Sequence, residues 1–473
     1  MELDSDWKSG FQTAFHISTL FRGYVEKGMW KTFLLLFPCG NPLFFVHTPC
    51  GRAKPWASRS FATFPQCFPL RLTITNYIPP LSGGAREIPG SPFSPHETED
   101  RTNMKFSCEK ALLQSAISTA SRAVSPKSSI PALEGILLEA GQELRLTGYN
   151  LDTGIRTIVP ADISETGTLV LAARLFGEII RKLPDDIVTF QTDNYMVHIT
   201  CGPSEFNILG TDPEEFPELP TVEYQNSLTL SQSKLKAMIS QTIFAVSDNE
   251  SRPVHTGSLF EASENGLTVV SVDGFRLALR HEAIDKKDGA PEFSFVVPGS
   301  ALSEVEKICT DCDEPVSVTQ GARHIMFKAG STMLVTRRLE GEFFAYRQAI
   351  PRSNDICLEG ETRALLSSIE RVSLIITEKL KCPLRCVFED GLMKISTKTA
   401  IGDAYDQCPV TGDGRGLEIG FNNKYLMDAL KAAPADKVRL ELSTSVSPCV
   451  ILPTEGEENF LYMVLPVRLK AGE

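Results

Sequence analysis

Cysteine is the residue type with the most chemical potential in this chain of 473 residues, which has twelve of them, nine after residue 103. Cys309 and Cys312 have the spacing of half a zinc site, and Cys382 and Cys386 come close to it. The two pairs lie 70 residues apart with no histidine near either, whereas zinc ribbons keep their halves closer. We therefore expect no metal site, and a thiol- or zinc-dependent enzyme built on these four cysteines is the minor alternative.

Other catalytic patterns are weaker still. No segment has the Gly-x-x-x-x-Gly-Lys-Ser/Thr of a phosphate-binding loop. The glycines at 412, 414 and 416 resemble a dinucleotide fingerprint only loosely, because the third-glycine spacing is missing, and they predict a surface turn. Seven scattered histidines allow no Ser-His-Asp arrangement to be assembled. The sequence therefore predicts a protein without catalytic residues or cofactors.

Composition changes sharply near residue 104. All three tryptophans, 11 of 30 prolines and 11 of 27 phenylalanines lie in the first 103 residues. That segment has 10 Lys and Arg against 8 Asp and Glu, a net charge of +2, whereas the other 370 residues have 37 against 51, a net of −14. A single domain rarely changes character this much, so we treat residues 1–103 and 104–473 as two objects.

The first 103 residues lack sustained periodicity. Their main apolar run, 32–37, is broken at Pro38 and resumes at 43–46; the start is acidic, which argues against a secretory signal. Residues 79–103 are rich in Pro, Gly, Ser and charge and predict an unstructured linker. We expect an unstructured extension, or a mis-annotated one with Met104 as the true start. The sequence contains no run of 18 apolar residues, so it predicts no membrane span.

A pattern of helix, strand, turn and alternating strand occurs three times after residue 103. Leu144, Leu267 and Leu392 mark it at intervals of 123 and 125 residues. A second helix follows each time, and its anchors Ile179, Val305 and Ala429 are 126 and 124 residues apart. The spacing predicts three α+β domains, each with two helices and several antiparallel strands, which is a normal domain size. Ser231 and Ser300 stand where two of these helices begin and are expected to cap them.

Positive charge gathers on the predicted helices. The segments 109–127, 174–182, 231–247, 300–308, 361–372 and 422–432 together carry a net charge of +6, which leaves −20 for the strands and loops after residue 103. A basic face on an acidic protein suits a polyanion held by its backbone without sequence readout. The alternative is ordinary amphipathic helices whose basic side chains face water.

Several dispersed motifs, in the right order, resemble one family: the bacterial DNA polymerase III beta subunits, which are replicative sliding clamps. The resemblance covers all 370 residues from Met104 onward. The matching segments are Met-Lys-Phe at 104–106, Phe-Pro-Glu-Leu at 216–219, Val-Asp-Gly-Phe-Arg-Leu-Ala at 272–278, Ile-Gly-Phe-Asn-x-x-Tyr at 419–425 and Val-Leu-Pro-Val-Arg-Leu at 464–469.

The resemblance implies three tandem DNA-clamp domains at 104–226, 227–352 and 353–473. Two chains would join head to tail into a closed ring, with helices lining the hole around double-stranded DNA and sheets facing solvent. The partners implied are a second copy of the chain, the replicative polymerase, the clamp loader and repair proteins, in the bacterial cytoplasm and without a membrane. The basic helices would hold phosphate loosely enough to slide.

The resemblance also implies a hydrophobic peptide pocket between the second and third domains. From the second domain it would take His255, Val272, Gly274, Phe275, Arg276 and Leu277. From the third it would take Leu380, Asn422, Tyr425, Val446, Pro448, Met463, Val464, Leu465, Pro466, Val467 and Arg468. The residues expected to face DNA are Arg122, Lys127, Arg174, Arg181, Lys182, Lys234, Lys236 and Arg252.

The chain departs from the family pattern at the pocket. The family often has Phe-Pro-Asp-Tyr-Arg-Arg where residues 343–348 read Phe-Phe-Ala-Tyr-Arg-Gln, and Phe275 replaces a frequent histidine. The changes Phe344, Ala345 and Gln348 alter one pocket edge and leave the preferred peptide open. Pro253 and Val254 stand where the family can carry aromatics near DNA. A clamp-like paralogue serving repair is an alternative that the sequence does not separate from a replicative clamp.

Overall fold

The computed structural model describes residues 31–36, 42–48, 103–283, 292–377, 382–454 and 459–469. The chain divides into two compact units, Met1–Pro95 and His96–Glu473. In the first unit the described residues form two antiparallel strands, β1 (Lys31–Leu36) and β2 (Pro42–Thr48). They are the two halves of the apolar run around Pro38, and they are regular structure in a segment where we expected none. The expected linker up to residue 102 lies outside the described residues.

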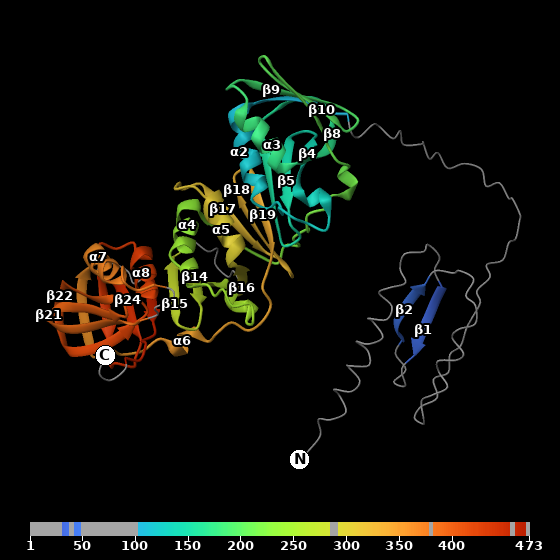
Figure 1. Cartoon of the computed structure of the whole chain (residues 1–473). Helices are drawn as coiled ribbons and strands as arrows, with labels where there is room; N and C mark the ends of the chain where they lie inside the picture. Colours follow the sequence, from blue (N-terminus) through green and yellow to red (C-terminus); the bar gives the residue numbers. More distant parts are fainter. Residues whose placement is uncertain are drawn as a thin grey trace, which may run out of the picture. The chain divides into compact units, whose positions relative to one another are not determined.

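The first repeat of the second unit contains two helices and nine strands among the described residues (Figure 1). In chain order they are β3 (Lys105–Glu109), α2 (Lys110–Ser121), β4 (Gly135–Ala140), β5 (Leu144–Tyr149), β6 (Thr153–Val159), β7 (Asp162–Glu165), β8 (Gly167–Ala172), α3 (Ala173–Lys182), β9 (Ile187–Asp193), β10 (Met196–Cys201) and β11 (Ser204–Leu209).

The second repeat follows the same order with one strand fewer between its helices. It comprises β12 (Asn226–Ser231), α4 (Gln232–Ser240), β13 (Gly257–Ser263), β14 (Gly266–Val272), β15 (Arg276–Glu282), β16 (Phe293–Pro298), α5 (Gly299–Ile308), β17 (Pro315–Gln320), β18 (His324–Ala329) and β19 (Thr332–Arg337). A connector containing the short helix α6 (Tyr346–Ala349) leads to the third repeat.

The third repeat fuses its central strands into two long ones. It comprises β20 (Ile356–Glu361), α7 (Thr362–Ser373), β21 (Leu384–Thr399), β22 (Gly402–Phe421), α8 (Asn423–Ala432), β23 (Lys437–Leu442), β24 (Cys449–Pro453) and β25 (Phe460–Val464). The pairing of β21 with β22 shifts register around Asp390, so Met393 and not Leu392 takes the buried position of Leu144 and Leu267. The interval of 125 residues from the sequence was one short for this reason.

The glycine-rich segment at 412–416 is not a turn between elements, as we had expected, but part of β22. Gly412 and Gly416 have φ of +113° and +67°, and Arg415 between them has φ of +55°. These left-handed conformations bend the strand, which glycine tolerates because it has no Cβ. The segment does not start a helix, so it offers no cradle of the dinucleotide type.

Two of the helices are shorter than predicted, and one of the two expected caps is present. The predicted 109–127 helix is α2, which ends at Ser121, and the predicted 231–247 helix is α4, which ends at Ser240. Ser231 caps α4 as expected, because its side chain accepts a hydrogen bond from the backbone N–H of Lys234. The cap expected at Ser300 was wrong: α5 begins after Pro298 without a side-chain cap, and Ser303 donates to the carbonyl of Gly299.

Three multistranded sheets build the second unit. One has the order β11-β10-β9-β3-β7 within the first domain. An eight-stranded sheet, β12-β17-β18-β19-β6-β5-β4-β8, joins the first and second domains, and a ten-stranded sheet, β16-β13-β14-β15-β25-β24-β23-β20-β22-β21, joins the second and third. In each domain the two helices pack against each other and on these strands (Figure 1). Two of the sheets therefore run from one domain into the next, because backbone hydrogen bonds pair the edge strands of neighbouring domains.

The hydrophobic cores follow the same continuity. Ala123 and Ile155 of the first domain belong to the core of the second. Ala245 and Ala278 of the second domain belong to the core of the third. The main core of the first domain, by contrast, consists of described residues between Met104 and Cys201. The cores of the second and third domains thus each include residues from the preceding domain, whereas the main core of the first domain does not include residues of another domain.

Candidate functional site: domain junctions, a basic helix face and an interdomain pocket

The junction between the first and second domains is the antiparallel pair β6 and β19. Ile155 lies opposite Leu334, and both are buried. Two pairs of threonine hydroxyls bridge the strands: Thr153 lies 3.2 Å from Thr336, and Thr157 lies 3.0 Å from Thr332, measured between Oγ1 atoms.

The junction between the second and third domains repeats this pairing with β15 and β25. β14 and β15 pair as β5 and β6 do, so Ala278 is the counterpart of Ile155. Ala278 lies opposite Tyr462, just as Ile155 lies opposite Leu334. Both junctions therefore have one register, in which the opposed pair points toward the helices.

A third set of these edges has no partner within the described residues. β11 is the first-domain counterpart of β19, and each follows a hairpin glycine with nearly the same φ, +55° at Gly202 and +54° at Gly330. The first half of β22 is the counterpart of β6 and β15. Large hydrophobic side chains are exposed along both edges: Phe206, Leu209, Ile401 and Tyr405. Unpaired edges with apolar side chains are sites of strand addition by another chain.

Arg276 is the centre of the junction between the second and third domains. Its Nε lies 2.8 Å from Asp273 Oδ2, and its Nη1 lies 2.6 Å from Asp428 Oδ2 on α8. Its guanidinium stacks over the ring of Tyr425, 4.5 Å from the centroid, and lies 5.4 Å from that of Phe244. The residue is only 8% exposed, so Arg276 acts first as a tie between two domains.

The structure brings most of the expected pocket residues together around this tie. Phe275 is 59% exposed and stacks on Tyr425 with 6.1 Å between ring centroids. Its backbone carbonyl accepts a hydrogen bond of 2.9 Å from Leu465 N–H. Leu277 pairs with Met463 and Arg276 with Val464, and the end of β14 places Val272 and Gly274 beside them. An exposed aromatic over a buried apolar floor is typical of a binding site.

The remaining expected pocket residues lie at different distances from this centre. Asn422 caps α8, where its side chain accepts from Lys424 N–H, and Val467 N–H donates to the Gly420 carbonyl. Pro448 directly precedes Cys449, the strand partner of Val464. Pro466 and Arg468 follow β25, and Val446 is 70% exposed in the loop before β24. Leu380 lies outside the described residues.

His255 lies on the connector side of the junction. Its ring meets that of Phe343 edge to face, 5.8 Å between centroids. Burial lowers the pKa of His255, and the nearby Arg252 lowers it further, so the neutral ring is favoured. Burial also raises the pKa of Tyr425, with Asp273 acting in the same direction. Both rings therefore stay uncharged near neutral pH and present apolar faces.

Sequence reasoning missed three residues of the tie: Phe244, Asp273 and Asp428. A signal existed for Asp428, which lies three residues after Tyr425 and so on the same side of α8. Asp273 had one too, because its carboxylate accepts hydrogen bonds from the backbone N–H groups of Phe275 and Arg276, as Asp often does in a turn. Phe244 had none, because only the tertiary fold places it beside Arg276.

The residues expected to face DNA lie on or next to the helices. Arg174, Arg181 and Lys182 are exposed on α3, Lys234 and Lys236 are on α4, Arg122 caps α2, and Lys127 and Arg252 are in loops. Four of them contact carboxylates: Lys236 to Asp311 at 2.8 Å, Lys234 to Glu282 at 3.9 Å, Arg181 to Glu178 at 2.6 Å and Arg122 to Glu304 at 3.4 Å. Within the described part of the chain, the other four have no carboxylate at ion-pair distance.

The observed helices keep the charge predicted for them. α3 and α4 carry +2 each, α2, α7 and α8 carry +1 each and α5 carries −1, a total of +6. Since the residues from Met104 onward sum to −14, the remainder carries −20. The contrast between a basic helix layer and an acidic remainder therefore holds for the folded chain.

The cysteines do not assemble a reactive site. Cys309 belongs to the second domain's core and Cys386 to the third's. Burial raises the pKa of Cys309 to about 11 and that of Cys386 well above its ordinary value, which disfavours the thiolate that a nucleophile or zinc ligand needs. Among the described residues no three His, Cys, Asp or Glu side chains form a group suited to a metal ion. The thiol- or zinc-dependent alternative therefore gains no support.

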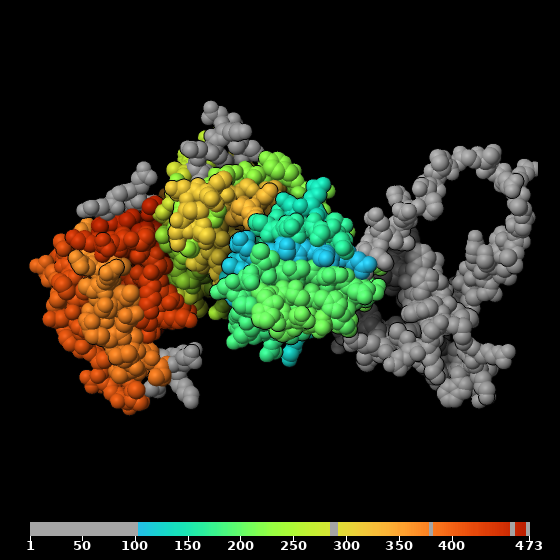
Figure 2. All heavy atoms as spheres, turned by 90° about the horizontal axis from the view of Figure 1, so that it is seen from above, coloured from blue at the N-terminus to red at the C-terminus, as the bar shows by residue number. Residues whose placement is uncertain are grey.

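Three α+β repeats, joined by one strand register and lined by basic helices, define the DNA-clamp class of protein. The space-filling view shows the second domain, mostly yellow, between the first in cyan and green and the third in orange and red (Figure 2). No described helix is long and apolar enough to cross a membrane.

Comparison with known proteins agrees with this class. Family models for the DNA polymerase III beta subunit match its N-terminal domain at residues 104–220, its central domain at 229–344 and its C-terminal domain at 347–468. The beta sliding clamp of Staphylococcus aureus is 33% identical over 377 residues, which cover 77% of this chain and 99% of the relative. That of Halalkalibacterium halodurans is 32% identical over 379 residues, covering 77% and 100%. The crystal structure of the Bacillus subtilis sliding clamp aligns with a TM-score of 0.74 at 30% identity, covering 78% and 100%.

The chain belongs to the DNA polymerase III beta subunit family. Clamps of this family are non-catalytic processivity factors of the replicative polymerase. They form homodimeric rings that encircle DNA, and they bind the polymerase and the clamp loader. The absence of a catalytic set in the sequence therefore agrees with the family's role.

Proposed function

We propose that the junction between the second and third domains is the docking site for the hydrophobic motifs of the polymerase, the clamp loader and repair proteins. The observation that carries the proposal is the exposed aromatic Phe275 over the buried pair Leu277 and Met463. Val467, 40% exposed, adds apolar surface from the third domain. An apolar floor with a few polar neighbours suits a short hydrophobic peptide.

Peptide binding tests this site. The variant Phe275→Asp/Val467→Asp should lose binding of a short Leu- and Phe-rich peptide in calorimetry, because it puts charge into the apolar contact. Tyr224→Asp, which changes a 73% exposed aromatic before β12, is the matched control and should bind as the parent does. Unchanged binding by the double variant would contradict the assignment. Deleting the chain from Met463 onward would not be a clean test of peptide binding, because it would truncate β25 and break the junction.

We also propose that the basic residues on and beside the helices hold duplex DNA by its phosphates. The support is the four exposed cations without a described carboxylate partner: Lys127, Arg174, Lys182 and Arg252. Arg174→Gln/Lys182→Gln should flatten the dependence of DNA affinity on salt, lowering the slope of log K against log salt by about 2 if both cations contact phosphate. Arg323→Gln/Lys328→Gln changes two exposed cations on and before β18 and should leave the slope unchanged.

The ring follows from the two unpaired edges. We propose that β11 of one protomer pairs with the first half of β22 of another in the register of the two internal junctions. That register sets Phe206 opposite Ala404 of the partner subunit, as Tyr462 lies opposite Ala278. An aromatic would then again face a small residue across the strands. Head-to-tail pairing of two copies uses both of these edges on each protomer and closes the assembly.

We propose domain limits of 104–226, 227–352 and 353–473, with 1–103 an extension that the ring does not need. The support is that β12 and β20, which open the second and third repeats, begin within a few residues of these limits. A chain that starts at Met104 should form the same dimer, by light scattering, as the full chain. Failure of the shorter chain to dimerise would contradict this. A clamp that acts on DNA in this way works in the bacterial cytoplasm, in replication or repair.

A further inference from the structure

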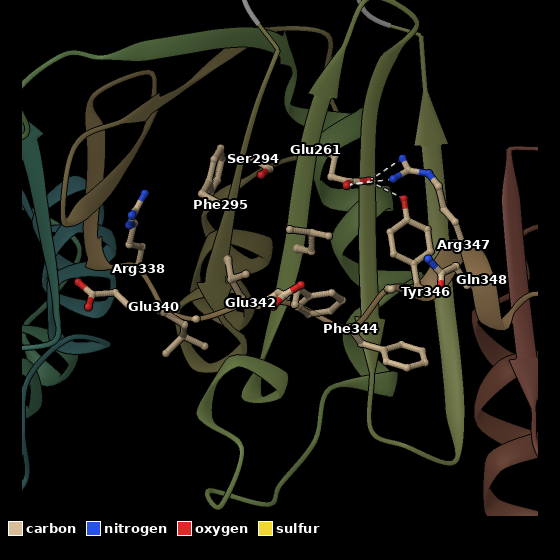
Figure 3. A pocket seen from close by; sticks show the side chains of 16 residues that line it. Glu261, Ser294, Phe295, Arg338, Glu340, Glu342, Phe344, Tyr346, Arg347 and Gln348 are labelled. Atoms are coloured by element: carbon tan, nitrogen blue, oxygen red, sulfur yellow. Dashed lines mark hydrogen bonds and ion pairs between the residues drawn. The ribbon is translucent and has the colours of Figure 1, made fainter.

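A groove of about 730 Å³ lies on the second domain, beside the proposed peptide pocket. Its floor is made by neighbouring residues of β13 and β16, including Leu259 and Val296, and its wall by the connector from Arg338 to Gln348 (Figure 3). Leu339 N–H donates to the Val296 carbonyl, so the connector begins as an addition to the free edge of β16 and then crosses the sheet. The lining includes Phe344, Ala345 and Gln348, which form the altered pocket edge, and none of the other residues placed in the pocket.

The groove and the peptide pocket share one hydrophobic floor. Leu259 and Val296 belong to the same buried cluster as Leu277 and Met463, which underlie the pocket. Tyr346, 3% exposed, belongs to this cluster as well and separates the two depressions. The groove and the pocket therefore lie over one continuous hydrophobic cluster.

The connector wall is held in place before any ligand arrives. Tyr346 donates a hydrogen bond of 2.5 Å to Glu261 Oε2, and Arg347 contacts both carboxylate oxygens of Glu261, at 3.1 and 2.7 Å (Figure 3). Burial and this hydrogen bond raise the pKa of Tyr346, so the phenol stays protonated as the donor. A preformed wall lowers the conformational cost of binding a flexible chain.

The other end of the groove has polar groups without partners. The Nε of Arg338 is buried and has no hydrogen-bond partner in the described residues. Glu340 and Glu342 are exposed, and no described cationic side chain lies at ion-pair distance from either. Glu261 is neutralised by Arg347, so the free charges on the wall are predominantly negative. The guanidinium of Arg338, which lines the groove, and two free carboxylates suit a backbone carbonyl and basic side chains.

We propose that this groove binds a basic, extended segment that flanks the hydrophobic motif of a partner protein seated in the pocket. This inference rests on the proposed docking function of the pocket and adds a second contact to it. A carbonyl of the segment accepts from Arg338, and its Lys or Arg side chains pair with Glu340 and Glu342. The pocket recognises the motif, and the groove selects among partners by the charge beside it.

Calorimetry with synthetic peptides tests the groove. The probes are a Leu- and Phe-rich core peptide, the same core with a six-residue Lys/Ser extension at either end, and the core with a Glu/Ser extension. The Lys/Ser extension at one of the two ends should tighten binding to the full-length parent about fivefold over the core peptide at low salt, as expected for two exposed ion pairs. The Glu/Ser extension should give no gain.

Charge reversal locates the effect. Glu340→Lys/Glu342→Lys should abolish the gain from the Lys/Ser extension and leave core-peptide binding unchanged. Glu214→Lys/Glu215→Lys is the matched control, because it reverses two exposed acids on the equivalent connector of the first domain, and it should keep the gain.

Each outcome bears on one of the two proposals. Core binding without a gain from either Lys/Ser extension, or a gain that survives Glu340→Lys/Glu342→Lys, would overturn the groove and leave the pocket standing. Failure of the core peptide to bind the parent would overturn the pocket, and the groove with it.

Discussion

The two junctions inside the chain share a strand register and differ in what covers it. At the first, Gly154 lies so close to the connector that a Cβ there would come within 2.2 Å of Leu219 Cδ2. At the second, the counterpart of Gly154 is Leu277, and Phe275, two residues earlier, is 59% exposed. The first junction is bridged by neutral hydroxyl pairs, whereas the second is tied by Arg276 between two carboxylates.

This difference distinguishes the features that hold two domains together from those that leave a surface for another molecule. Backbone pairing and an opposed pair of inward side chains suffice to join two domains, since both junctions have them. The first connector covers its junction with Leu219, so little apolar surface is left for another molecule. The second junction leaves Phe275 and Val467 exposed and needs an ionic tie as well. The third junction, proposed to form between two copies, has only its edges within the single chain.

The largest effect should come from the unpaired edge of β11. Phe206→Asp should convert the dimer to a monomer of about half the mass, because a charge would replace the side chain proposed to enter the partner's core. Phe206 is 36% exposed in the single chain, so the fold should survive. Light scattering of the eluted protein measures the mass, and Tyr224→Asp is the control that should remain dimeric. A dimer of unchanged stability in Phe206→Asp would break the analogy among the three junctions.

Arg276→Ala should have the next largest effect. It leaves Asp273 and Asp428 without their cation in a mostly buried site, a change that costs about 3 kcal/mol of unfolding free energy. Urea denaturation measures the loss, and Arg276→Lys should recover part of it because charge returns without the two-sided geometry. A loss of unfolding free energy smaller than that of Thr336→Val, a variant at the first junction, would show that the tie adds little to the second junction.

Gly154→Ala probes the covered first junction. A methyl group at this position must displace Leu219, which should destabilise the chain by about 2 kcal/mol as overpacking does. Gly141→Ala is the matched control, since a Cβ there meets nothing within 4 Å, and its unfolding midpoint should hardly move. Equal midpoints for the two variants would mean that Leu219 does not seal the junction.

Thr336→Val should have the smallest effect of the four. It removes one hydroxyl of a buried pair and leaves Thr153 without that partner, at a cost of about 1 kcal/mol in urea denaturation. Thr229→Val, at an exposed position on β12, should be close to neutral. A larger loss than that of Arg276→Ala would reverse the ranking of the two junctions.

Local sequence patterns predicted much of the fold. The threefold spacing and the six helices were predictable because amphipathic periodicity is a property of each segment alone. The anchor at Leu392 was misplaced by one residue because a strand irregularity at Asp390 cannot be seen without the partner strand. The cap at Ser300 failed for a similar reason: the backbone already starts the helix after Pro298, so the hydroxyl is not needed there.

The sequence by itself determined the repeat, the charge difference between helices and remainder, and the family. These depend on residue types and spacing, which are independent of how distant segments meet. Only the tertiary structure decided that Arg276 ties two domains through Asp428, that Leu219 seals one junction, and that a groove runs beside the pocket. Each joins residues far apart along the chain, and such contacts are set by the packing of whole domains.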